Sequence, residues 1–545
     1  MNKTKEAINK IIGKDGILDN TIPNYEVRKA QLDIAYNVLD AVTNRKTVLI
    51  EAGTGIGKTM AYLVAAAMSG KKVVISTATK NLQDQIYYNE VPLLVNKTCL
   101  DIPVLLLKGR SSYLCIKKLR ELDLDISLDN VVYGERSEFP DIKEWDKVTV
   151  NIDDCERCPH TEICYLESVK RIAKQSRLLI TNHSLTIIDS ILKTQGKGIL
   201  PDYDLVIFDE AHKLEDAAIK CFSTTKKMDD IIDVIKEEMI TENKHHKQHV
   251  NDIMSELKRD KEILQNVVVA FQQMREDNNT LVWSEEENKE IVIKTASTDI
   301  GDKLEYVLNR KGVVFISGTL TVDDSFDYIK NIYNITHNEE YKYQTEFDTG
   351  KSMMIFQRDL PSPTEKEFIP AAAERIIDII VKAKGRSLVL FNSYASLNQT
   401  YDIVKDRIDY LLLRQGDNTR VSLLSNFKRS IDSVLFATGS FWEGVDVPGE
   451  ALSCVVIHRL PFPHPNDPIV KLKESKGNSF GKYCLPKAVM LLHQGVGRLL
   501  RNKNDIGVVV VMDKRIIDDK YNKIFLNGLP PMQASLNIED INTVL

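Results

Sequence analysis

The chain has 545 residues, of which 43% are hydrophobic and 28% charged, and a formal net charge of −6 at pH 7. This composition excludes a disordered protein, and the length predicts about three to four domains. No apolar run is long enough to span a bilayer, and the amino-terminal stretch lacks the apolar core of a secretory signal. We therefore expect a cytoplasmic protein with no membrane partner. The mildly negative charge does not indicate a nucleic-acid binder, although a binding groove needs only local positive charge.

The first chemical motif follows an apolar run at residues 47–50. It is the glycine-rich sequence AGTGIGKT at residues 52–59, in which alanine takes the place of the usual first glycine. A glycine-rich turn between a strand and a helix presents backbone N–H groups to phosphate oxygens. Lys58 is expected to supply a charge for the outer phosphates, and the Thr59 hydroxyl is expected to bind Mg²⁺. The other phosphate-binding positions are Gly53, Thr54, Gly55 and Gly57.

Short apolar runs alternate with helical patterns along most of the chain, which is typical of parallel α/β units. In the first half the runs lie at residues 47–50, 72–76, 104–107, 178–181, 205–208 and 313–316. In the second half they lie at residues 353–356, 387–391, 410–413, 433–437, 454–457 and 507–511. The sequence therefore predicts two parallel sheets, with a boundary in the polar stretch 336–349.

Two segments depart from this rhythm. Residues 109–175 have few strand signals and contain Cys155, Cys158 and Cys164, with Cys115 upstream. In a cytosolic protein such cysteines favour a metal or a cluster over disulfides, and four thiolates suit zinc as well as an iron–sulfur cluster. Residues 214–296 are charged, with apolar positions at helical spacing, which predicts a projecting module of antiparallel helices.

The apolar run 205–208 leads directly into the sequence Asp-Glu-Ala-His at residues 209–212. Asp209 is expected to hold the metal, and Glu210 is expected to polarise the attacking water. Together with the glycine-rich loop, this pair predicts a nucleoside-triphosphate hydrolase. Near the carboxyl end, Arg498 and Arg501 lie three residues apart on one predicted helix face, where both can stabilise charge on a γ-phosphate. We expect the nucleotide to touch Lys58 on one side and these arginines on the other.

The order of these motifs resembles that of the superfamily 2 helicases. The segments that carry the resemblance are residues 52–59, 209–212 (a DEAH box), 317–320, 439–446 and 494–501. Residues 109–115, 181–185 and 460–463 are similar to segments of the iron–sulfur branch, the DinG and XPD group, and within it to bacterial DinG. About two dozen residues precede Tyr25, too few for the exonuclease domain of some DinG proteins, so we expect none.

The resemblance implies two RecA-like P-loop motor domains, of which the first is interrupted twice. The first would comprise residues 1–108, 176–213 and 297–335, with an iron–sulfur domain at 109–175 and a helical arch at 214–296. The second would comprise residues 336–545.

It also implies a role for each matching residue. Arg28 and Gln31 would read the adenine, and Ser317 and Thr319 would link the nucleotide state to the DNA. From the second motor domain, the residues that would complete the ATP site are Gln494, Arg498 and Arg501, with Glu443 and Asp446 nearby. The resemblance favours a 4Fe-4S cluster over zinc on Cys115, Cys155, Cys158 and Cys164.

For the nucleic acid, the resemblance implies backbone contacts from Thr77 and Thr79 and from Ser393 and Tyr394. Tyr113, Tyr394 and Trp442 are candidates for stacking on bases. An aromatic ring next to a strand is nevertheless more often part of the core, and at Trp442 we favour the core.

The implied function is that of an ATP-dependent DNA helicase, active as a monomer in DNA repair. It would translocate 5′ to 3′ on single-stranded DNA and unwind tailed or branched duplexes, forks or R-loops, with ATP, Mg²⁺ and a 4Fe-4S cluster as cofactors. Two alternatives stay open. One is an ATP-gated nucleic-acid-binding module that does not separate strands, and the other is an RNA helicase, because backbone contacts do not reveal whether a 2′-OH is tolerated.

Overall fold

The computed structural model describes most of the chain. The residues that it does not describe are 1, 24, 54, 123–125, 127, 130, 151–154, 156–157, 243–260, 277–279, 288–289, 298–299, 310, 345–348, 443–446, 448, 476, 478, 500–504, 519–520 and 530. The chain divides into two compact units. The first comprises residues 1–50, 57–316 and 332–341, and the second comprises residues 51–56, 317–331 and 342–545.

The first large sheet has seven strands in the order β10-β1-β9-β5-β2-β4-β3. In chain order its strands are β1 (Thr47–Ala52), β2 (Val73–Thr77), β3 (Val104–Leu106), β4 (Leu178–Asn182), β5 (Leu205–Asp209), β9 (Gly312–Ser317) and β10 (Glu339–Tyr343). The pairings of β2 with β4 and β5, of β3 with β4 and of β5 with β9 are all parallel. Strand β5 is buried along its whole length, as a parallel strand covered on both faces must be, which explains its continuous apolar run.

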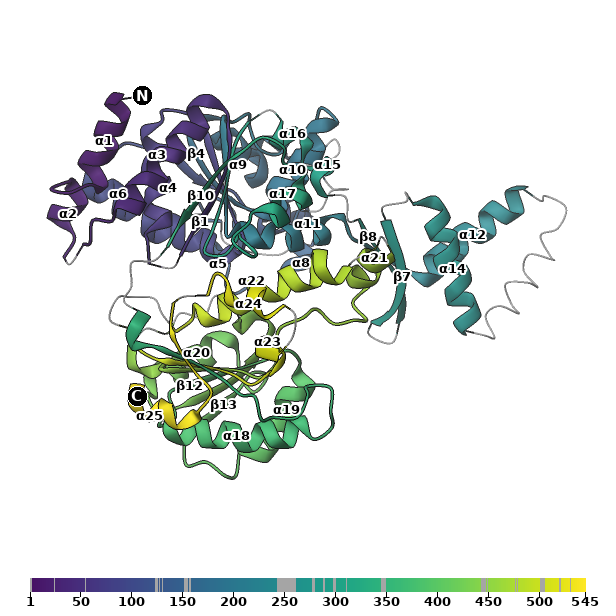
Figure 1. Cartoon of the computed structure of the whole chain (residues 1–545). Coiled ribbons are helices and arrows are strands. Elements are labelled where there is room, and N and C mark those ends of the chain that lie inside the picture. The colour runs from purple at the N-terminus through teal and green to yellow at the C-terminus, as the bar shows by residue number, and fades with distance from the viewer. Residues whose placement is uncertain are drawn as a thin grey trace. The chain divides into compact units, whose positions relative to one another are not determined.

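Helices cover this sheet. They include α1 (Asn2–Ile12), α2 (Ile17–Thr21), α3 (Lys29–Asn44), α4 (Lys58–Met68), α5 (Lys80–Gln85), α6 (Val91–Thr98), α9 (Tyr165–Gln175), α10 (His183–Thr194), α11 (Leu214–Phe222), α15 (Ile300–Lys303), α16 (Glu305–Leu308) and α17 (Asp327–Tyr333). Helix α4 is buried at every position from Met60 to Ala66 and packs against α3 (Figure 1). An apolar helix enclosed on all sides follows the glycine-rich loop, so its amino terminus is held firmly in place.

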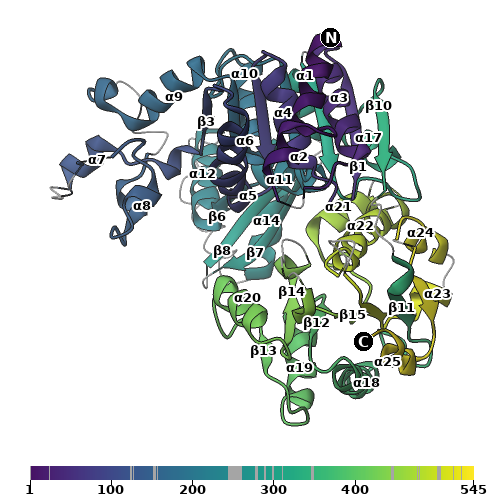
Figure 2. The same ribbon diagram turned by 90° about the vertical axis from the view of Figure 1, so that its left-hand side faces the viewer.

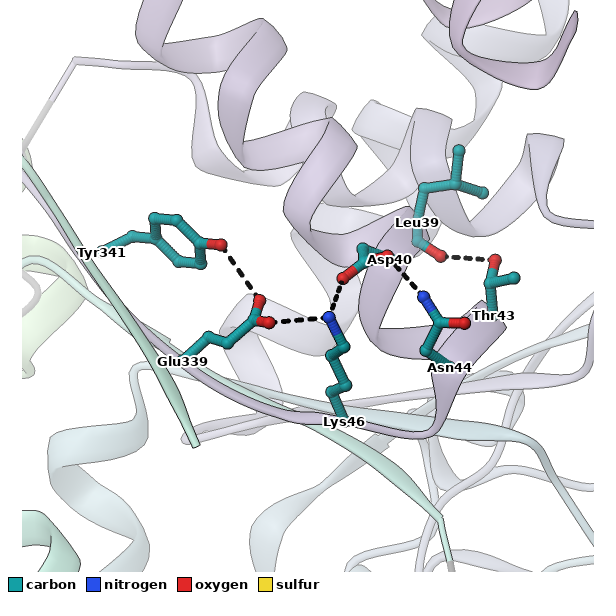
Figure 3. A network of polar contacts seen from close by, with 7 residues as sticks. All are labelled: Leu39, Asp40, Thr43, Asn44, Lys46, Glu339 and Tyr341. Carbon is teal, nitrogen blue, oxygen red and sulfur yellow. Dashed lines mark hydrogen bonds and ion pairs between the residues drawn. The ribbon is translucent and has the colours of Figure 1, made fainter. Parts of the chain in front are cut away.

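Strand β10 is an addition that the sequence did not predict, because its residues are polar. It lies next to β1 at the edge of the first sheet. The Lys46 ammonium, just before β1, is 2.7 Å from both the Asp40 carboxylate of α3 and the Glu339 carboxylate of β10 (Figure 3). The Tyr341 hydroxyl donates to Glu339 at 3.0 Å. These contacts fix the polar edge strand to the helix beside it.

The cysteine-rich segment has little regular structure, as predicted. Its helices α7 (Ile116–Glu121) and α8 (Trp145–Val148) lie side by side, with single bridges from Tyr113 to Glu135 and from Leu114 to Thr149 (Figure 2). A small core forms between them from Leu114, Ile116, Leu119, Phe139, Trp145 and Val148.

The charged module is only partly helical, which corrects the prediction of helices throughout. Helices α12 (Met228–Glu242) and α14 (Lys261–Arg275) do occur. They pack on an antiparallel sheet ordered β6-β8-β7, with β6 (Thr224–Lys227), β7 (Thr280–Glu287) and β8 (Glu290–Ser297) (Figure 1). The apolar positions predicted at residues 250–257 lie outside the described residues. The hairpin was missed because its acidic strand ends obscure the period of two.

The second large sheet is parallel at every pairing, in the order β13-β14-β12-β15-β16-β11-β17. Its strands are β11 (Met353–Phe356), β12 (Ser387–Phe391), β13 (Leu412–Arg414), β14 (Val434–Thr438), β15 (Cys454–Ile457), β16 (Val508–Val511) and β17 (Gln533–Ser535). Leu388 and Leu390 belong to one apolar core, and Val389 and Phe391 to another, because successive side chains of a strand point to opposite faces. The prediction of an α/β fold with two parallel sheets is confirmed.

The helices of the second unit include α18 (Phe368–Lys382), α19 (Tyr394–Val404), α20 (Arg420–Arg429), α21 (Pro468–Ser475), α22 (Leu485–Val496), α23 (Arg515–Asp518), α24 (Asn522–Leu526) and α25 (Ile541–Val544). Among the described residues of the whole chain, no helix has the length and apolar character that crossing a membrane requires.

Candidate active site

The glycine-rich loop turns directly into helix α4. Gly55 and Gly57 have φ angles of 78° and 87°, a left-handed backbone that glycine adopts without strain. A Cβ at Gly57 would lie 2.3 Å from Nε2 of Gln31, so the Gln31 amide would have to move away from the loop. Thr54 lies outside the described residues, and the Gly53 N–H donates to the Tyr343 carbonyl at 3.3 Å.

The segment expected to read the adenine lies against this loop. Gln31 is buried and donates from Nε2 to the Gly57 carbonyl at 3.2 Å. Its Oε1 accepts a hydrogen bond of 2.8 Å from the Tyr25 hydroxyl. Arg28 directly precedes α3 without a capping hydrogen bond from its side chain, and it pairs with Glu26 at 2.8 Å. The structure thus brings Gln31 to the glycine-rich loop and leaves Arg28 beside an acidic neighbour.

Asp209 ends β5 and is buried close to the first turn of α4. Its Oδ2 accepts a hydrogen bond of 3.1 Å from the Tyr62 hydroxyl. Burial and the adjacent Glu210 carboxylate raise the pKa of Asp209 to about 7, whereas the Lys58 ammonium acts in the opposite direction. Thr59 hydrogen-bonds to the same Tyr62, whose pKa burial raises well above its usual value. Asp209, which is far from Lys58 and Thr59 in sequence, therefore shares Tyr62 with Thr59, and the Lys58 ammonium is close enough to act on its pKa.

Glu210 has an unusual backbone. Its φ of 54° lies in the left-handed region, which a residue with a side chain occupies only when its surroundings impose it. Its N–H donates to Oδ1 of Asp209 at 3.1 Å, and its side chain, 30% exposed, is 3.4 Å from Nδ1 of His212. This turn presents one carboxylate to the interior and the other towards solvent.

The oxygen donors at this place are those that Mg²⁺ prefers, a carboxylate from Asp209 and a hydroxyl from Thr59. Magnesium is usually held by one or two protein oxygens together with phosphate and water, so the small number of donors fits it. In the part of the chain that the structure describes, no group of three or more His, Cys, Asp or Glu side chains is arranged to hold a metal ion.

In the second unit, Glu51 holds the loop that contains residues 317–321. Its Oε2 accepts hydrogen bonds of 2.6 Å from the N–H groups of Leu320 and Thr321, and its Oε1 accepts one of 2.8 Å from the Thr321 hydroxyl. Lys342 lies 3.4 Å from the same carboxylate. Glu51 is buried, so these bonds are shielded from water and hold the loop in one conformation.

The same loop contacts the arginine-bearing segment. The amide of Gln494, in α22, donates to the Thr319 hydroxyl, and the Thr319 N–H donates to Ser317 Oγ at 3.2 Å. Arg498 donates to Oε1 of Gln494 at 3.0 Å and to its carbonyl at 3.2 Å. Gln494 therefore connects Thr319 to Arg498. Arg501, Glu443 and Asp446 lie outside the described residues.

Of the predicted cysteine ligands, Cys155 has a thiol whose pKa is shifted. The thiols of Cys164 and Cys115 add to burial in raising the pKa of Cys155, while Arg110 and Lys170 lower it. The soft sulfur donors of these cysteines suit an iron–sulfur cluster or zinc. Because the described side chains do not form a finished metal-binding group, the identity of the metal stays a prediction.

The predicted DNA-contacting residues cap two helices. Thr79 Oγ1 accepts from the Leu82 N–H at the start of α5, and Ser393 Oγ accepts from the Ser396 N–H at the start of α19. Thr77 is buried, and its hydroxyl donates to the Thr79 carbonyl at 3.1 Å. Tyr394 is 51% exposed, and its hydroxyl accepts a bond of 2.7 Å from Gln415.

Two of the three candidate stacking rings are buried in the core. Tyr113 is 0% exposed, and its hydroxyl accepts from the Lys108 N–H at 3.0 Å. Trp442 is 1% exposed and donates from Nε1 to the Phe391 carbonyl at 3.0 Å. Neither ring offers a face to a base in this structure, which corrects the stacking roles suggested for them. The prediction of stacking now depends on Tyr394.

Sequence reasoning missed several residues that shape the site, namely Tyr25, Glu51 and Tyr62, and a buried histidine near it, His183. Glu51 carried a signal, since it is the one charged residue in the otherwise apolar stretch before the glycine-rich loop. Tyr62 lies one helical turn after Lys58, a spacing that places both on one side of α4. Tyr25 carried no local signal, and His183 belongs to a segment noted only as similar to a family.

A model of the DEAD/DEAH box helicases matches residues 32–157, and a model of the helicase C-terminal domain matches residues 376–532. By fold and motif the chain is a helicase of the DEAD/DEAH box class. A solved XPD helicase structure is similar to 94% of the chain and to all of its own length, with a TM-score of 0.62 and 18% identity, a likeness of fold.

Two curated relatives match almost the whole chain. The ATP-dependent DNA helicase YoaA of Haemophilus influenzae is 28% identical, over 99% of this chain and 99% of its own. The ATP-dependent helicase DinG of Mycobacterium tuberculosis is 27% identical, over 95% of each. The chain therefore carries both helicase domains and is similar along almost its whole length to the ATP-dependent helicases YoaA and DinG.

Proposed function

We propose that this helicase moves 5′ to 3′ along single-stranded DNA and unwinds tailed or branched duplexes, R-loops included. The observation that carries the proposal is the contact of Thr59 and Asp209 with the same Tyr62, beside Glu210 and within reach of the Lys58 charge. It occurs in a chain whose relatives are named as ATP-dependent helicases. The direction of movement is supported by the resemblance to the DinG and XPD group.

Each site residue has a proposed part in ATP hydrolysis. The N–H groups of the glycine-rich loop and the Lys58 ammonium bind the phosphates, and Gln31 fixes the loop next to the base. Asp209 and Thr59 would hold Mg²⁺, which neutralises phosphate charge. Glu210 orients a water molecule and accepts its proton as the oxygen bonds to the γ-phosphorus and the bond to ADP breaks. By the resemblance, the second motor domain would complete the site with Gln494, Arg498 and Arg501, and Glu443 and Asp446 would take part as well.

We propose that Cys115, Cys155, Cys158 and Cys164 hold a 4Fe-4S cluster. The support is the resemblance to the iron–sulfur group, the raised pKa of Cys155 beside Cys115 and Cys164, and the small size of the core in this segment. A short segment with few buried side chains gains much of its stability from covalent ligands, so the cluster would act as a structural staple. On the DNA side we propose backbone contacts by Thr77, Thr79, Ser393 and Tyr394.

Strand displacement tests the function. Duplexes with a 5′ tail or a 3′ tail, each with a DNA or an RNA loading strand, are offered to the purified protein with ATP and Mg²⁺. We expect displacement only from the 5′ tail on a DNA loading strand. Unwinding from the 3′ tail would refute the direction, and equal unwinding on RNA would support the RNA helicase alternative. ATP hydrolysis stimulated by single strands without any displacement would support the binding module.

Three substitutions test the ATP site. Lys58→Ala, Glu210→Gln and Arg501→Ala should each abolish displacement, since each removes a group that acts on the phosphates or the water. Glu210→Gln keeps size and hydrogen bonding and should still bind ATP. Wild-type unwinding by any one of these variants would remove that residue from the site. As a matched control, Glu339→Gln alters an exposed carboxylate of β10 and should unwind normally.

The cluster is tested by colour. Protein purified without oxygen should absorb in the visible region, as a 4Fe-4S cluster does, whereas a zinc protein would be colourless and contain zinc by metal analysis. Cys155→Ser should lose both colour and unwinding and retain much of the nucleotide binding. Cys99→Ser is the matched control, because that cysteine lies outside the set. Unimpaired unwinding by a colourless Cys155→Ser protein would make the cluster dispensable.

A further inference from the structure

A buried histidine lies behind the catalytic glutamate and belongs to none of the roles above. His183 is the first residue of α10, directly after β4, and is 1% exposed. Strand β2 pairs with β4 on one side and with β5 on the other, and Ser76 is opposite both Thr181 and Phe208. The His183 ring thus lies where β2 ends, between the strand that precedes it and the strand that carries Asp209.

The ring is bonded on one side to the β2 segment. Its Nδ1 is 2.9 Å from the Ser76 hydroxyl, which in turn accepts a hydrogen bond of 3.0 Å from Thr186. The ring meets Phe208 edge to face, with 5.8 Å between centroids. Burial lowers the pKa of His183 to about 3, so the ring is neutral and carries a single N–H.

The other side of the ring faces Glu210. Both the backbone and the carboxylate of Glu210 raise the pKa of His183 against the effect of burial. Because the Ser76 hydroxyl accepts from Thr186 and can donate to Nδ1, we place the N–H of the neutral ring on Nε2. Nε2 is buried and makes no hydrogen bond with the residues that this structure describes. Glu210 has the left-handed backbone described above, which needs support from its neighbours. A buried donor next to a strained catalytic residue is suited to holding that residue in one orientation.

The Ser76 end of the network leads to the proposed DNA contacts. Ser76 is followed by Thr77, whose hydroxyl bonds to the Thr79 carbonyl, and Thr79 caps α5. A shift of this loop on binding a phosphate backbone would move Ser76 and, through Nδ1, the ring. All the members of the network lie in the first unit.

We propose that His183 is a positioning residue that couples DNA binding at the Thr77–Thr79 loop to the orientation of Glu210. When the loop grips the strand, the Nε2–H aligns with the Glu210 carbonyl and directs its carboxylate to the water. This inference rests on the proposed function, because it presupposes that single-stranded DNA binds the loop and stimulates ATP hydrolysis.

The test compares two substitutions that each keep half of the ring's contacts. In His183→Gln the amide N–H takes the place of Nε2 and can still reach the Glu210 backbone, whereas in His183→Asn the amide takes the place of Nδ1 and can reach only Ser76. His183→Phe keeps the ring and removes both contacts. The values measured are kcat and KM for ATP, with and without saturating oligothymidylate, and the affinities for a fluorescent ADP analogue and for the oligothymidylate.

We expect the stimulation of kcat by oligothymidylate to fall about 5–20-fold in His183→Asn and His183→Phe, and much less in His183→Gln. The basal kcat, the KM and both affinities should change little. The matched control is His458→Phe, which replaces another fully buried neutral histidine, one that lies edge to face with Phe368 in the second unit. Its stimulation should equal that of the wild type.

Two results would overturn the inference alone. The first is full stimulation of kcat by oligothymidylate in a folded His183→Phe protein. The second is a uniform loss, in which the Gln and Asn variants lose stimulation equally or basal and stimulated kcat fall together, because that would show a merely structural histidine. Should His183→Phe fail to fold, the Gln and Asn pair decides. A wild-type protein that binds and hydrolyses ATP without any response to single-stranded DNA would instead refute the proposed function, and this coupling with it.

Discussion

Replacing Glu51 with alanine should destabilise the second unit and disable the loop at residues 317–321. The carboxylate accepts the N–H groups of Leu320 and Thr321, and these N–H groups would have no acceptor after the change. A buried N–H without an acceptor costs about 1–3 kcal/mol, so two cost about 2–6 kcal/mol. Because the cost of burying the carboxylate is recovered, we expect a loss of about 3 kcal/mol.

The isosteric change Glu51→Gln separates charge from shape. Glutamine keeps one acceptor oxygen for the two N–H groups but lacks the negative charge that strengthens the bonds and attracts Lys342. We expect a loss of about 1 kcal/mol. For a domain of this size about 2–4 °C of melting temperature corresponds to each kcal/mol, so Glu51→Ala should melt about 6–12 °C below the wild type and Glu51→Gln about 2–4 °C below it.

The assay is thermal unfolding of the full chain, followed by calorimetry so that separate transitions are resolved. Glu339→Gln is the control, since its carboxylate is far more exposed and its loss should barely change melting. Glu51→Ala should also lose ATP hydrolysis while it still binds a fluorescent ADP analogue, because Thr319 and its contact with Gln494 belong to the same loop. Melting of Glu51→Ala within about 1 °C of the wild type would refute the reasoning, because the two N–H groups would then have found other acceptors.

Three further outcomes are expected. Trp442→Ala should lower the free energy of unfolding by about 3–5 kcal/mol, measured by calorimetry, because core packing is lost. Trp442→Phe should bind single-stranded DNA as the wild type does. A loss of DNA affinity without a loss of stability would restore the stacking role. Gly57→Ala should weaken nucleotide binding at least tenfold (about 1.4 kcal/mol), because its Cβ would displace Gln31 and the backbone is left-handed; unchanged affinity in equilibrium titration would contradict this. Burial lowers the pKa of His458 to about 3 and that of His493 to about 4, so below about pH 6.5 the unfolded chain binds protons that the folded chain does not. As the pH is lowered below about 6.5, the free energy of unfolding should therefore fall by roughly 1.4 kcal/mol per pH unit for each histidine, until the folded pKa values are reached. Melting temperatures that stay level from pH 7 to about 5 would contradict this prediction.

The sequence predicted the interior of both sheets and the chemical motifs, for physical reasons. Strands buried on both faces are continuous apolar runs, and Val508–Val511 is an example that needs no structural context. The strand Glu339–Tyr343 has no such run, because an edge strand can hold polar side chains that find partners elsewhere. Its Glu339 finds Lys46, which also contacts Asp40, and nothing in the local sequence reveals these distant partners.

The site shows the same division. Lys58, Thr59 and Asp209 could be identified because phosphate and metal chemistry dictates those residue types in a short pattern. Tyr62 and Glu51 act through contacts between segments distant in sequence, and no motif specifies them. Trp442 shows the converse limit, since an aromatic residue beside a motif has the same letter whether it fills the core or faces a ligand.

The chain passes between the two units several times, and this limits where it can be divided into separate fragments. Residues 51–56 and 317–331 group with the second unit, whereas residues 332–341 group with the first. A truncation after Ser317 would therefore leave the first sheet without its edge strand, and a fragment that starts at Lys342 would lack Glu51 and the backbone that it secures. No single cleavage point therefore yields two intact units. Limited proteolysis within residues 317–341 should inactivate both units together, and expression of either fragment alone should give an insoluble product.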